Sequence, residues 1–315
     1  MKKTIKKDEQ KETEGNVQGS VLGGVHKTVL LKETIDGLNL SGNEIVLDAT
    51  FGGGGHAKEA LNRFPKIKCI ALDQDIDAWR RFENKSLDIS FHNLNFRYLD
   101  EALKKEEVRQ VDGVIFDFGL SSDQFETSGR GFSFMKNEPL FMTMKENPSS
   151  EDLTAEDVVN DWSEESLTKI IFGYGEEKFA RRIARGIVQA REKGRLKNTF
   201  DLVQAIEESV PAIYKKGRLH FATRTFQAIR IAVNDELGAI SEALPKAFDA
   251  LKREGRMSVI SFHSLEDRIV KRFFKKMAED GLAKIITKKP LSASEIELKE
   301  NPRARSAKLR IIEKI

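Results

Sequence analysis

Asp48-Ala-Thr-Phe-Gly-Gly-Gly-Gly-His56 is the stretch of this 315-residue chain that decides its fold. It follows the short apolar run Glu44-Ile-Val-Leu47, which predicts a buried strand, and it leads into a helical pattern from Ala57 onward. Consecutive glycines let the backbone turn tightly and let a ligand approach without meeting a Cβ atom. Together these features predict an open α/β sheet with a nucleotide-like ligand at the turn, rather than a glycine turn without a ligand.

The ligand can be narrowed from the charges around the turn. Gly52-x-Gly54-x-x-Ala57 formally fits the dinucleotide fingerprint, and Asp73 follows at about the expected ~20 residues. However, the carboxylate of Asp48, at the carboxyl end of the strand, would repel a pyrophosphate and attract a cation. S-adenosylmethionine is an adenosine that carries a sulfonium and an ammonium group. The sequence therefore favours S-adenosylmethionine over NAD.

Acidic residues end three of the predicted strands. The apolar runs 45–47, 68–72 and 113–116 are followed by Asp48, Asp73 and Asp117, and a further strand is predicted at 88–92. Carboxylates gathered at one edge of a parallel sheet repel one another, so a donor-rich ligand explains them better than stability does. We expect Asp73 to bind the ribose hydroxyls, the alternative being a helix N-cap. Phe96 is expected against the adenine, although a core position would suit it equally.

The alternation of strands and helices stops after Asp117. Helices are predicted at 164–172, 176–193 and 199–209, and Ser128–Phe134 is a glycine-rich loop with Arg130 beside aromatic residues. This composition suits stacking on nucleic-acid bases, or a loop that its own phenyl rings hold in place. The predicted organisation is a disordered tail at 1–24, a Rossmann-like core at 25–124 and 221–315, and an all-helical insertion at 125–220.

The α/β pattern resumes at 221 with a predicted helix to 237. Its Thr223, Gln227, Arg230 and Asn234 form a polar stripe that indicates a site. A fifth strand, 256–262, ends before His263. Ser264 and Asp267 have the spacing of a capping box, which argues against a hydrolase that uses His263 and Ser264. The segments 284–289 and 307–313 are predicted to form an antiparallel pair.

Composition and charge narrow the class of protein. No apolar run approaches the ~18–20 residues that span a membrane, and no signal peptide is recognisable, so a cytoplasmic protein is expected. The one cysteine, Cys69, lies in an apolar run and is expected in the core. The net charge is +3, but residues 252–315 carry 17 basic and 9 acidic residues. That asymmetry suits a polyanionic partner or a solvated charged surface.

Taken together, these motifs resemble the bacterial MraW-type methyltransferases from His26 to the end of the chain. Those enzymes methylate the exocyclic N4 of a cytosine in 16S ribosomal RNA, near the decoding centre of the small subunit. The resemblance implies an S-adenosylmethionine-dependent methyltransferase core with an inserted helical substrate-recognition domain. It rests on His26–Leu31, Asp48–His56, Asp117–Gln124, Arg130–Phe134, Tyr174–Glu177, Ala222–Gln227, Ile260–Arg268 and Asn301–Ser306.

The same resemblance suggests site residues, and no metal is among its implications. Asp117 is the expected catalytic residue. The family usually has Asp, Arg and Pro where this chain has Phe141, Thr143 and Phe221, which bears on the fit to RNA more than on the cofactor. The implied cofactor contacts are Gly54, Gly55, His56, Asp73, Phe96, Asp117 and Gln124. The expected RNA contacts are Arg130, Phe132, Arg224, Gln227, Arg230, Asn234 and His263.

The cytosine amine is a poor nucleophile because its lone pair is delocalised into the ring. An enzyme must align it with the methyl–sulfur bond and accept a hydrogen bond from its N–H, for which Asp117 or the carbonyls of the following loop are suited. Two rival hypotheses remain: a ribosome-assembly protein that has lost turnover, and a methyltransferase for another nucleic-acid or protein amine. The sequence leaves open whether the chain forms a homodimer.

Overall fold

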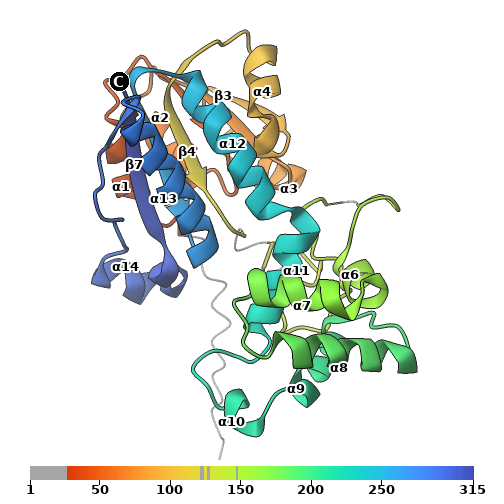
Figure 1. The fold of residues 1–315 in the computed structure, drawn as a ribbon. Helices are drawn as coiled ribbons and strands as arrows, with labels where there is room; N and C mark the ends of the chain where they lie inside the picture. The colour runs from red at the N-terminus through yellow and green to blue at the C-terminus, as the bar shows by residue number, and fades with distance from the viewer. Residues whose placement is uncertain (1–26, 121–123, 126–127, 147) are drawn as a thin grey trace, which may run out of the picture.

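The computed structural model describes residues 27–120, 124–125, 128–146 and 148–315, so the predicted disordered tail at 1–24 lies outside the described residues. Two units are visible in Figure 1: a sheet with helices on both faces, and below it a group of short helices. None of the described helices is long and apolar enough to cross a bilayer.

The sheet has seven strands in the order β3-β2-β1-β4-β5-β7-β6. The pairs among β1 to β5 are parallel, and β7 runs antiparallel between β5 and β6. The predicted Rossmann-like sheet and its antiparallel closing pair are therefore confirmed. The chain runs outward from β1 to β3 and then returns to β4, so ligands are expected beside β1 and β4, where the order reverses. The strands are Ile45–Asp48, Lys68–Asp73, Ile89–Asn93, Val111–Asp117, Leu251–Ser261, Ala283–Ile285 and Lys308–Lys314, from β1 to β7.

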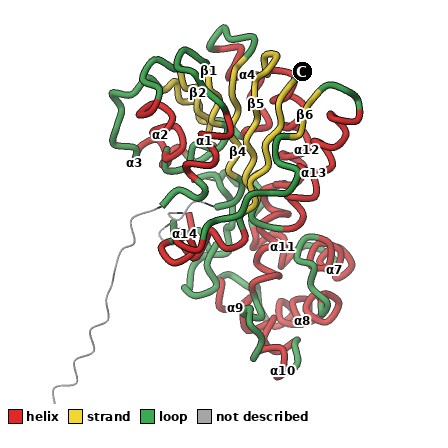
Figure 2. The backbone as a smooth tube through the Cα atoms, turned by 90° about the vertical axis from the view of Figure 1, so that its left-hand side faces the viewer, coloured by secondary structure: helices red, strands yellow, loops and turns green. Residues whose placement is uncertain are grey.

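Helices cover both faces of this sheet, as Figure 2 shows. Alternate strand residues face opposite sides; in β4, Ile115 packs with one group of helices while Val114 and Phe116 pack with the other. Burial on both faces explains why the strands are continuous apolar runs rather than alternating ones. Cys69 is fully buried in β2, as predicted. One face is covered by α1 (Leu31–Leu38), α2 (Gly55–Arg63) and α3 (Ile76–Arg81), the other by α4 (Leu99–Lys105), α12 (Glu236–Ala250) and α13 (Ser264–Glu279).

The helical unit has an apolar core of its own. In α8 the buried side chains Ile183, Ala184 and Ile187 face this core, and arginines occupy the opposite side. Thr154 and Asp157 form a capping box at the start of α6. The helices are α6 (Ala155–Asp161), α7 (Glu164–Gly173), α8 (Ala180–Lys193), α9 (Thr199–Ser209), α10 (Ala212–Lys215) and α11 (Thr223–Asn234), and a short α14 (Glu295–Glu300) lies near the C-terminus.

A single residue separates the last helix of the helical unit from the next helix, which packs on the sheet. The helix predicted at 221–237 is broken: α11 ends at Asn234, Asp235 has the left-handed backbone angles φ 46° and ψ 44°, and α12 begins at Glu236. Phe226 and Ile229 of α11 pack in the helical core, whereas α12 packs on the sheet. The two helices therefore follow one another from one core to the other without a loop (Figure 1).

Candidate active site

A pocket opens at the carboxyl ends of β1, β2 and β4, on the side that faces the helical unit. Of the cofactor residues implied by the sequence, Gly55, His56, Asp73, Phe96, Asp117 and Gln124 line it. Gly54 does not line the pocket but precedes α2 as its N-cap residue, with φ 72°. The structure therefore brings residues from 55 to 124 of the chain to one sheet edge. Residues 121–123, within the loop after β4, lie outside the described part of the chain.

The glycine turn also serves packing. A Cβ atom on Gly55 would lie 1.8 Å from Oγ1 of Thr28, so this glycine lets the first described segment of the chain pass across the turn. On Gly54, a Cβ would lie 2.7 Å from both the Phe51 and Phe82 rings. Only glycine accommodates both the backbone angles and these close approaches.

Asp73 presents an anchored carboxylate at the end of β2. Its Oδ2 accepts a hydrogen bond from the Gly52 N–H at 2.8 Å, and its Oδ1 accepts one from the Asp75 N–H at 2.8 Å. Burial raises the pKa of Asp73 to about 6. The alternative interpretation of Asp73 as the helix cap is wrong, because Asp75 accepts the capping hydrogen bond from Asp77 at the start of α3. Asp73 is thus free to face a ligand in the pocket.

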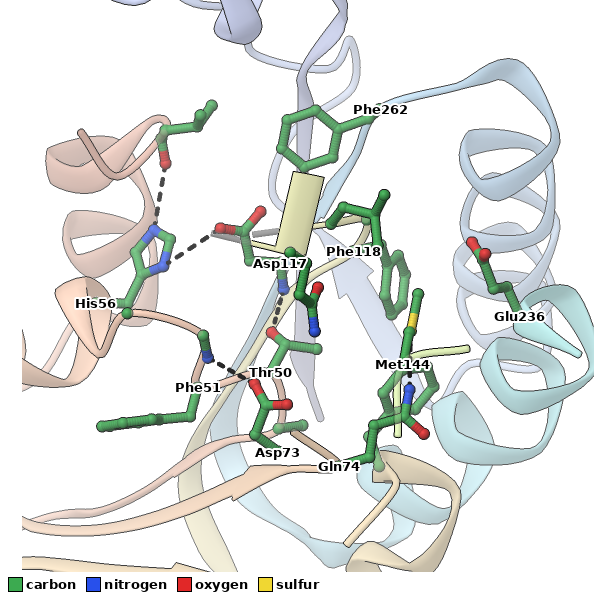
Figure 3. A pocket seen from close by; sticks show the side chains of 18 of the residues that line it. Thr50, Phe51, His56, Asp73, Gln74, Asp117, Phe118, Met144, Glu236 and Phe262 are labelled. Carbon is green, nitrogen blue, oxygen red and sulfur yellow. Dashed lines mark hydrogen bonds and ion pairs between the residues drawn. The ribbon is translucent and has the colours of Figure 1, made fainter. Parts of the chain in front are cut away.

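Asp117 ends β4, which lies across β1 from the strand that ends in Asp73, and its carboxyl group lies near His56 (Figure 3). Its Oδ2 lies 3.8 Å from Nδ1 of His56, whose Nε2 donates to the Val29 carbonyl at 3.2 Å. Its Oδ1 is buried and makes no hydrogen bond with the residues that the structure describes. Burial, with the nearby charges of Asp48 and Glu266, raises the pKa of Asp117 well above its usual value. A carboxyl group in this state needs a donor or a positive charge from a ligand.

Asp48 differs from the sequence expectation. It was expected to point at the ligand, but its side chain is 1% exposed and does not line the pocket. Its Oδ1 accepts from the Thr50 N–H at 3.2 Å, and burial raises its pKa to about 7. Asp48 therefore acts on the pocket through its charge and through the turn that it holds, rather than by direct contact.

Comparison with known proteins identifies the family. A sequence model of the MraW methylase family matches residues 24–315. The chain belongs to the MraW methylase family. It is therefore a methyltransferase that uses S-adenosylmethionine.

Two solved structures resemble this MraW-family chain at low identity. One is a protein from Streptococcus mutans described as a methyltransferase in complex with SAH, 13% identical, which covers 92% of this chain and 100% of its own with a TM-score of 0.44. The other is an rRNA methylase from Streptococcus thermophilus, 12% identical, with coverages of 90% and 95% and a TM-score of 0.41.

The MraW-family pocket fits its cofactor. Asp73 offers acceptors for two ribose hydroxyls. The uncompensated carboxyl of Asp117 suits a ligand that carries a sulfonium and an ammonium group, because a nearby positive charge favours the ionised acid. Phe96 packs edge-on to Phe116 with ring centroids 5.8 Å apart, and together with Leu94 and Ile240 it supplies an apolar wall for adenine. Phe96 thus lines the pocket and also packs against the core, and its contact with adenine stays a prediction.

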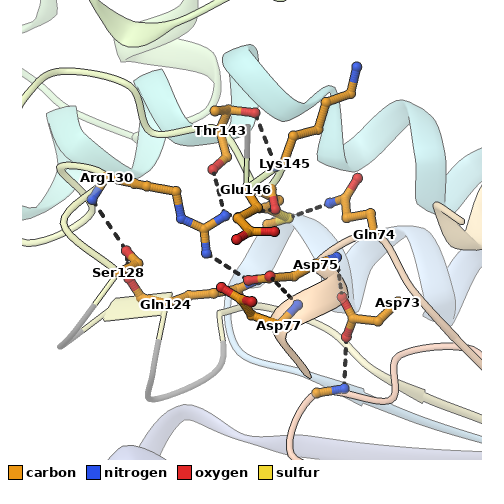
Figure 4. A network of polar contacts seen from close by, with 12 residues as sticks. Asp73, Gln74, Asp75, Asp77, Gln124, Ser128, Arg130, Thr143, Lys145 and Glu146 are labelled. Carbon is orange, nitrogen blue, oxygen red and sulfur yellow. Dashed lines mark hydrogen bonds and ion pairs between the residues drawn. The ribbon is translucent and has the colours of Figure 1, made fainter. Parts of the chain in front are cut away.

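A buried network ties the rim of the pocket to the helical unit (Figure 4). The Arg130 guanidinium donates to Asp75 Oδ2 at 2.6 Å and to the Met144 carbonyl at 2.9 Å, and Gln124 donates to the same carboxylate oxygen at 3.1 Å. The Arg130 side chain is only 10% exposed. Arg130 is therefore placed to hold the loop 128–144 rather than to stack on a base.

The aromatic residues near Arg130 are also engaged within the protein. Phe132 is 5% exposed and packs in the helical core. Phe134 stacks on His220, with ring centroids 4.5 Å apart. Of the two interpretations of the loop 128–134, the structure matches the one in which its own rings hold it in place. Thr143, one of the departures from the family pattern, is buried, whereas Phe141 is 36% exposed.

The polar stripe on α11 holds the helical unit together and only partly faces the pocket. Gln227 donates to the Tyr174 carbonyl at 3.1 Å, and Arg224 donates to the Glu176 carbonyl at 2.8 Å. Asn234 donates to the Met142 carbonyl at 2.7 Å and accepts from the Met144 N–H at 2.8 Å. Within the described residues, Asn234 is the member of the predicted RNA set that lines the pocket.

The capping box of α13 lies one residue earlier than predicted. His263, rather than Ser264, is the N-cap, and Glu266 closes the box. Asp267 instead receives a hydrogen bond from Arg310 Nε at 2.7 Å. His263 is therefore a cap whose side chain is occupied by Glu266, although it remains near the pocket.

Several pocket residues were missed by sequence reasoning: Thr50, Met144, Glu236, Phe262 and Glu266. Side-chain atoms of Glu236, His263 and Glu266 lie within 4.8 Å of one another, a spacing that a metal ion also uses. However, both carboxylate oxygens of Glu236 accept hydrogen bonds from Arg230, at 2.8 and 2.9 Å. The guanidinium thus supplies the positive charge that a metal would bring. The signal for Glu266 was present in the His-Ser-Leu-Glu-Asp stretch but was assigned to the wrong capping pair.

Proposed function

We propose that the protein methylates the exocyclic N4 of a cytosine in 16S ribosomal RNA, near the decoding centre of the small subunit, and that it does so in the cytoplasm. The observation that carries this proposal is the Asp117 carboxyl in the pocket, whose buried Oδ1 makes no hydrogen bond with the described residues. An amine that becomes positively charged as it is methylated needs an acceptor of this kind. The identity of the base and of the RNA in this proposal rests on the resemblance of the sequence motifs to the MraW-type methyltransferases.

In the proposed reaction the cofactor provides the methyl group, and residues of the chain position the reactants and stabilise the developing charge. S-adenosylmethionine supplies the methyl group: the nitrogen lone pair forms the N–C bond while the C–S bond breaks and its electron pair stays on sulfur. Asp117 accepts a hydrogen bond from the acceptor amine and stabilises the positive charge that develops on it. Thr50 holds the end of β4 in place, because its Oγ1 accepts the Asp117 N–H at 2.6 Å. Asp73 orients the other end of the cofactor.

A basic groove supports an RNA substrate. It lies between α8 and α9 and is lined by Arg181, Arg182, Arg185 and Lys193, all exposed. Cationic side chains along one helix are suited to successive phosphates of a folded RNA. Glu208 also lines the groove, so its charge is not uniform. The groove belongs to the helical unit, which the family resemblance assigns to substrate recognition.

Methyl transfer into ribosomal subunits tests the proposal. Small subunits purified from cells that lack this methyl group are incubated with the protein and S-adenosylmethionine labelled in the methyl group. We expect label in 16S RNA, at N4 of a single cytosine when the product is mapped by digestion and mass spectrometry. Binding without label would favour the assembly-protein hypothesis. Label on another nucleotide or on a ribosomal protein would favour the hypothesis of a different acceptor amine.

A further inference from the structure

We propose that Phe262 and Glu266, at the carboxyl end of β5, form the subsite for the acceptor base: the ring packs on the face of the base, and the carboxylate accepts a hydrogen bond from its exocyclic amine. The proposal rests on the function proposed above for the identity of the base. It places the base between β4 and β5, away from the loop 128–134.

The sheet brings this pair next to Asp117. β5 runs parallel to β4 with Ile260 opposite Asp117, and the Phe118 N–H donates to the Ile260 carbonyl at 3.1 Å. Phe262 therefore emerges beside the end of β4. Its ring lies close to Gly119, where an added Cβ would be 3.3 Å from Cδ2 of Phe262. Figure 3 shows this ring near Asp117, while Phe118 lies toward Gln74 and Met144.

Phe262 and Phe96 mark two different ends of the pocket. Phe96 packs with Phe116 and Phe118, at ring-centroid distances of 5.8 and 5.7 Å, on the side assigned to adenine. Phe262 also lines the pocket but makes none of these ring contacts, and it is only partly buried. An aromatic ring at the wall of a pocket, beside the catalytic carboxyl, is suited to stacking on a planar base.

Glu266 is rigidly held and faces the same end. Its Oε2 accepts the N–H groups of Phe262 at 2.7 Å and His263 at 3.2 Å, and its Oε1 lies 3.1 Å from Nε2 of His263. The residue is 1% exposed, yet it lines the pocket. A carboxylate has about four acceptor sites, so sites remain on Oε1 for a ligand.

The pKa values of the two carboxyl groups near the acceptor are shifted in opposite directions. Although burial opposes it, the hydrogen bond from His263 and the charge of Arg230 lower the pKa of Glu266. Burial raises the pKa of Asp117. Paired acids with opposite shifts divide acid and base roles between them. The pKa of Glu266 therefore lies below that of Asp117, so Glu266 is the stronger acid of the two.

The subsite distinguishes an amine from a carbonyl. A cytosine presents two N–H donors at its exocyclic position, one for Asp117 and one for Glu266. Uracil presents a carbonyl oxygen there, which a fixed carboxylate repels. When the N–C bond has formed, one N–H proton passes to Glu266 and then to water, and its electron pair returns to the nitrogen.

Nucleoside binding tests the subsite independently of ribosomal RNA. The protein is saturated with S-adenosylhomocysteine, and cytidine and uridine are titrated by NMR. We expect wild-type protein to prefer cytidine at least tenfold, Glu266→Gln to lose the preference, and Phe262→Leu to weaken both nucleosides. Asp157→Asn, which changes the equivalent capping-box acid of α6 far along the chain, is the matched control and should keep the preference.

Each outcome is decisive. Equal binding of cytidine and uridine to wild-type protein, or a preference that survives in Glu266→Gln, overturns the subsite. Should Glu266→Gln fail to fold, Phe262→Leu still decides, since unchanged cytidine binding refutes the stacking role. A cytidine preference without methylation of small subunits would remove the proposed RNA function but keep the subsite. Methylation of small subunits by a protein that shows no preference for cytidine would keep the proposed RNA function and remove the subsite.

Discussion

Replacing Arg130 by Met distinguishes a buried ion pair from an RNA contact. The change removes the guanidinium but keeps most of the apolar stem. Asp75 is 1% exposed, and without Arg130 the hydrogen bond from the Gln124 amide at 3.1 Å is the one that its Oδ2 would keep among the described residues. Removing one partner of a buried ion pair costs about 3–5 kcal/mol, and the remaining hydrogen bonds place this case near the lower limit, at about 3 kcal/mol.

Equilibrium unfolding in urea measures this effect. Lys145→Met on the same loop is the control: Lys145 is 57% exposed, so its loss should change stability by less than about 1 kcal/mol. Adding Asp75→Asn to Arg130→Met removes the unpaired charge and should restore part of the loss, a coupling of about 1–3 kcal/mol. If Arg130→Met unfolds at the normal urea concentration but binds RNA more weakly, the structural role is refuted. Arg130 would then be a residue that contacts RNA.

Other predictions concern the cofactor, the chemistry and the RNA. Asp73→Ala should weaken S-adenosylmethionine binding by about 1.5–3 kcal/mol in calorimetry, and NAD should not bind. The pKa of Asp73 in the folded protein is raised to about 6, so its contribution to folding stability is present below about pH 4 and is lost as the pH rises through 6. Cofactor affinity should increase over the same pH range, because the ionised carboxylate is the better acceptor. Asp73→Asn should remove this pH dependence of affinity. Asp117→Asn should slow single-turnover methyl transfer at least tenfold with cofactor saturating, and an unchanged rate would reassign the acceptor. Binding to 16S RNA should weaken steeply with salt, and Arg181→Gln with Arg185→Gln should lower the logarithmic slope by about 2, whereas an unchanged slope would mean a solvated surface.

The sheet was predictable from sequence because its signals are local. Each strand is a short apolar run, and the acids that follow three of them had to share one edge once the strands were parallel. How deeply each of these acidic side chains is buried was not predictable from the sequence. The Asp48 side chain is covered, whereas Asp73 and Asp117 reach the pocket, although Asp117 ends the middle strand of the sheet. Depth depends on what packs above the strand end, which no local pattern records.

The site residues of the helical unit were harder to predict because their partners are distant in sequence. Arg130 finds Asp75, 55 residues away. An arginine between aromatic residues has the same appearance whether it binds RNA or an internal carboxylate. The α13 cap was missed for a different reason: His263/Glu266 and Ser264/Asp267 have the same spacing, and the end of β5 decides between them. Asp235 was missed because Asp tolerates left-handed angles without the usual Gly signal.

The one-residue junction at Asp235 makes α11 a lever. A helix of twelve residues is about 18 Å long, so a rotation of about 10° at its base moves its far end by about 3 Å. The helices α6 and α7 pack on α11, and α8 packs in turn on α6 and α7, so a movement of α11 is passed to α8 through them. Arg97, bonded to Asp235 at 2.6 Å, and Arg230, bonded to Glu236, brace the pivot from both sides. Small changes in backbone angle beside the cofactor pocket are thus amplified into displacements of the arginine-bearing surface of α8.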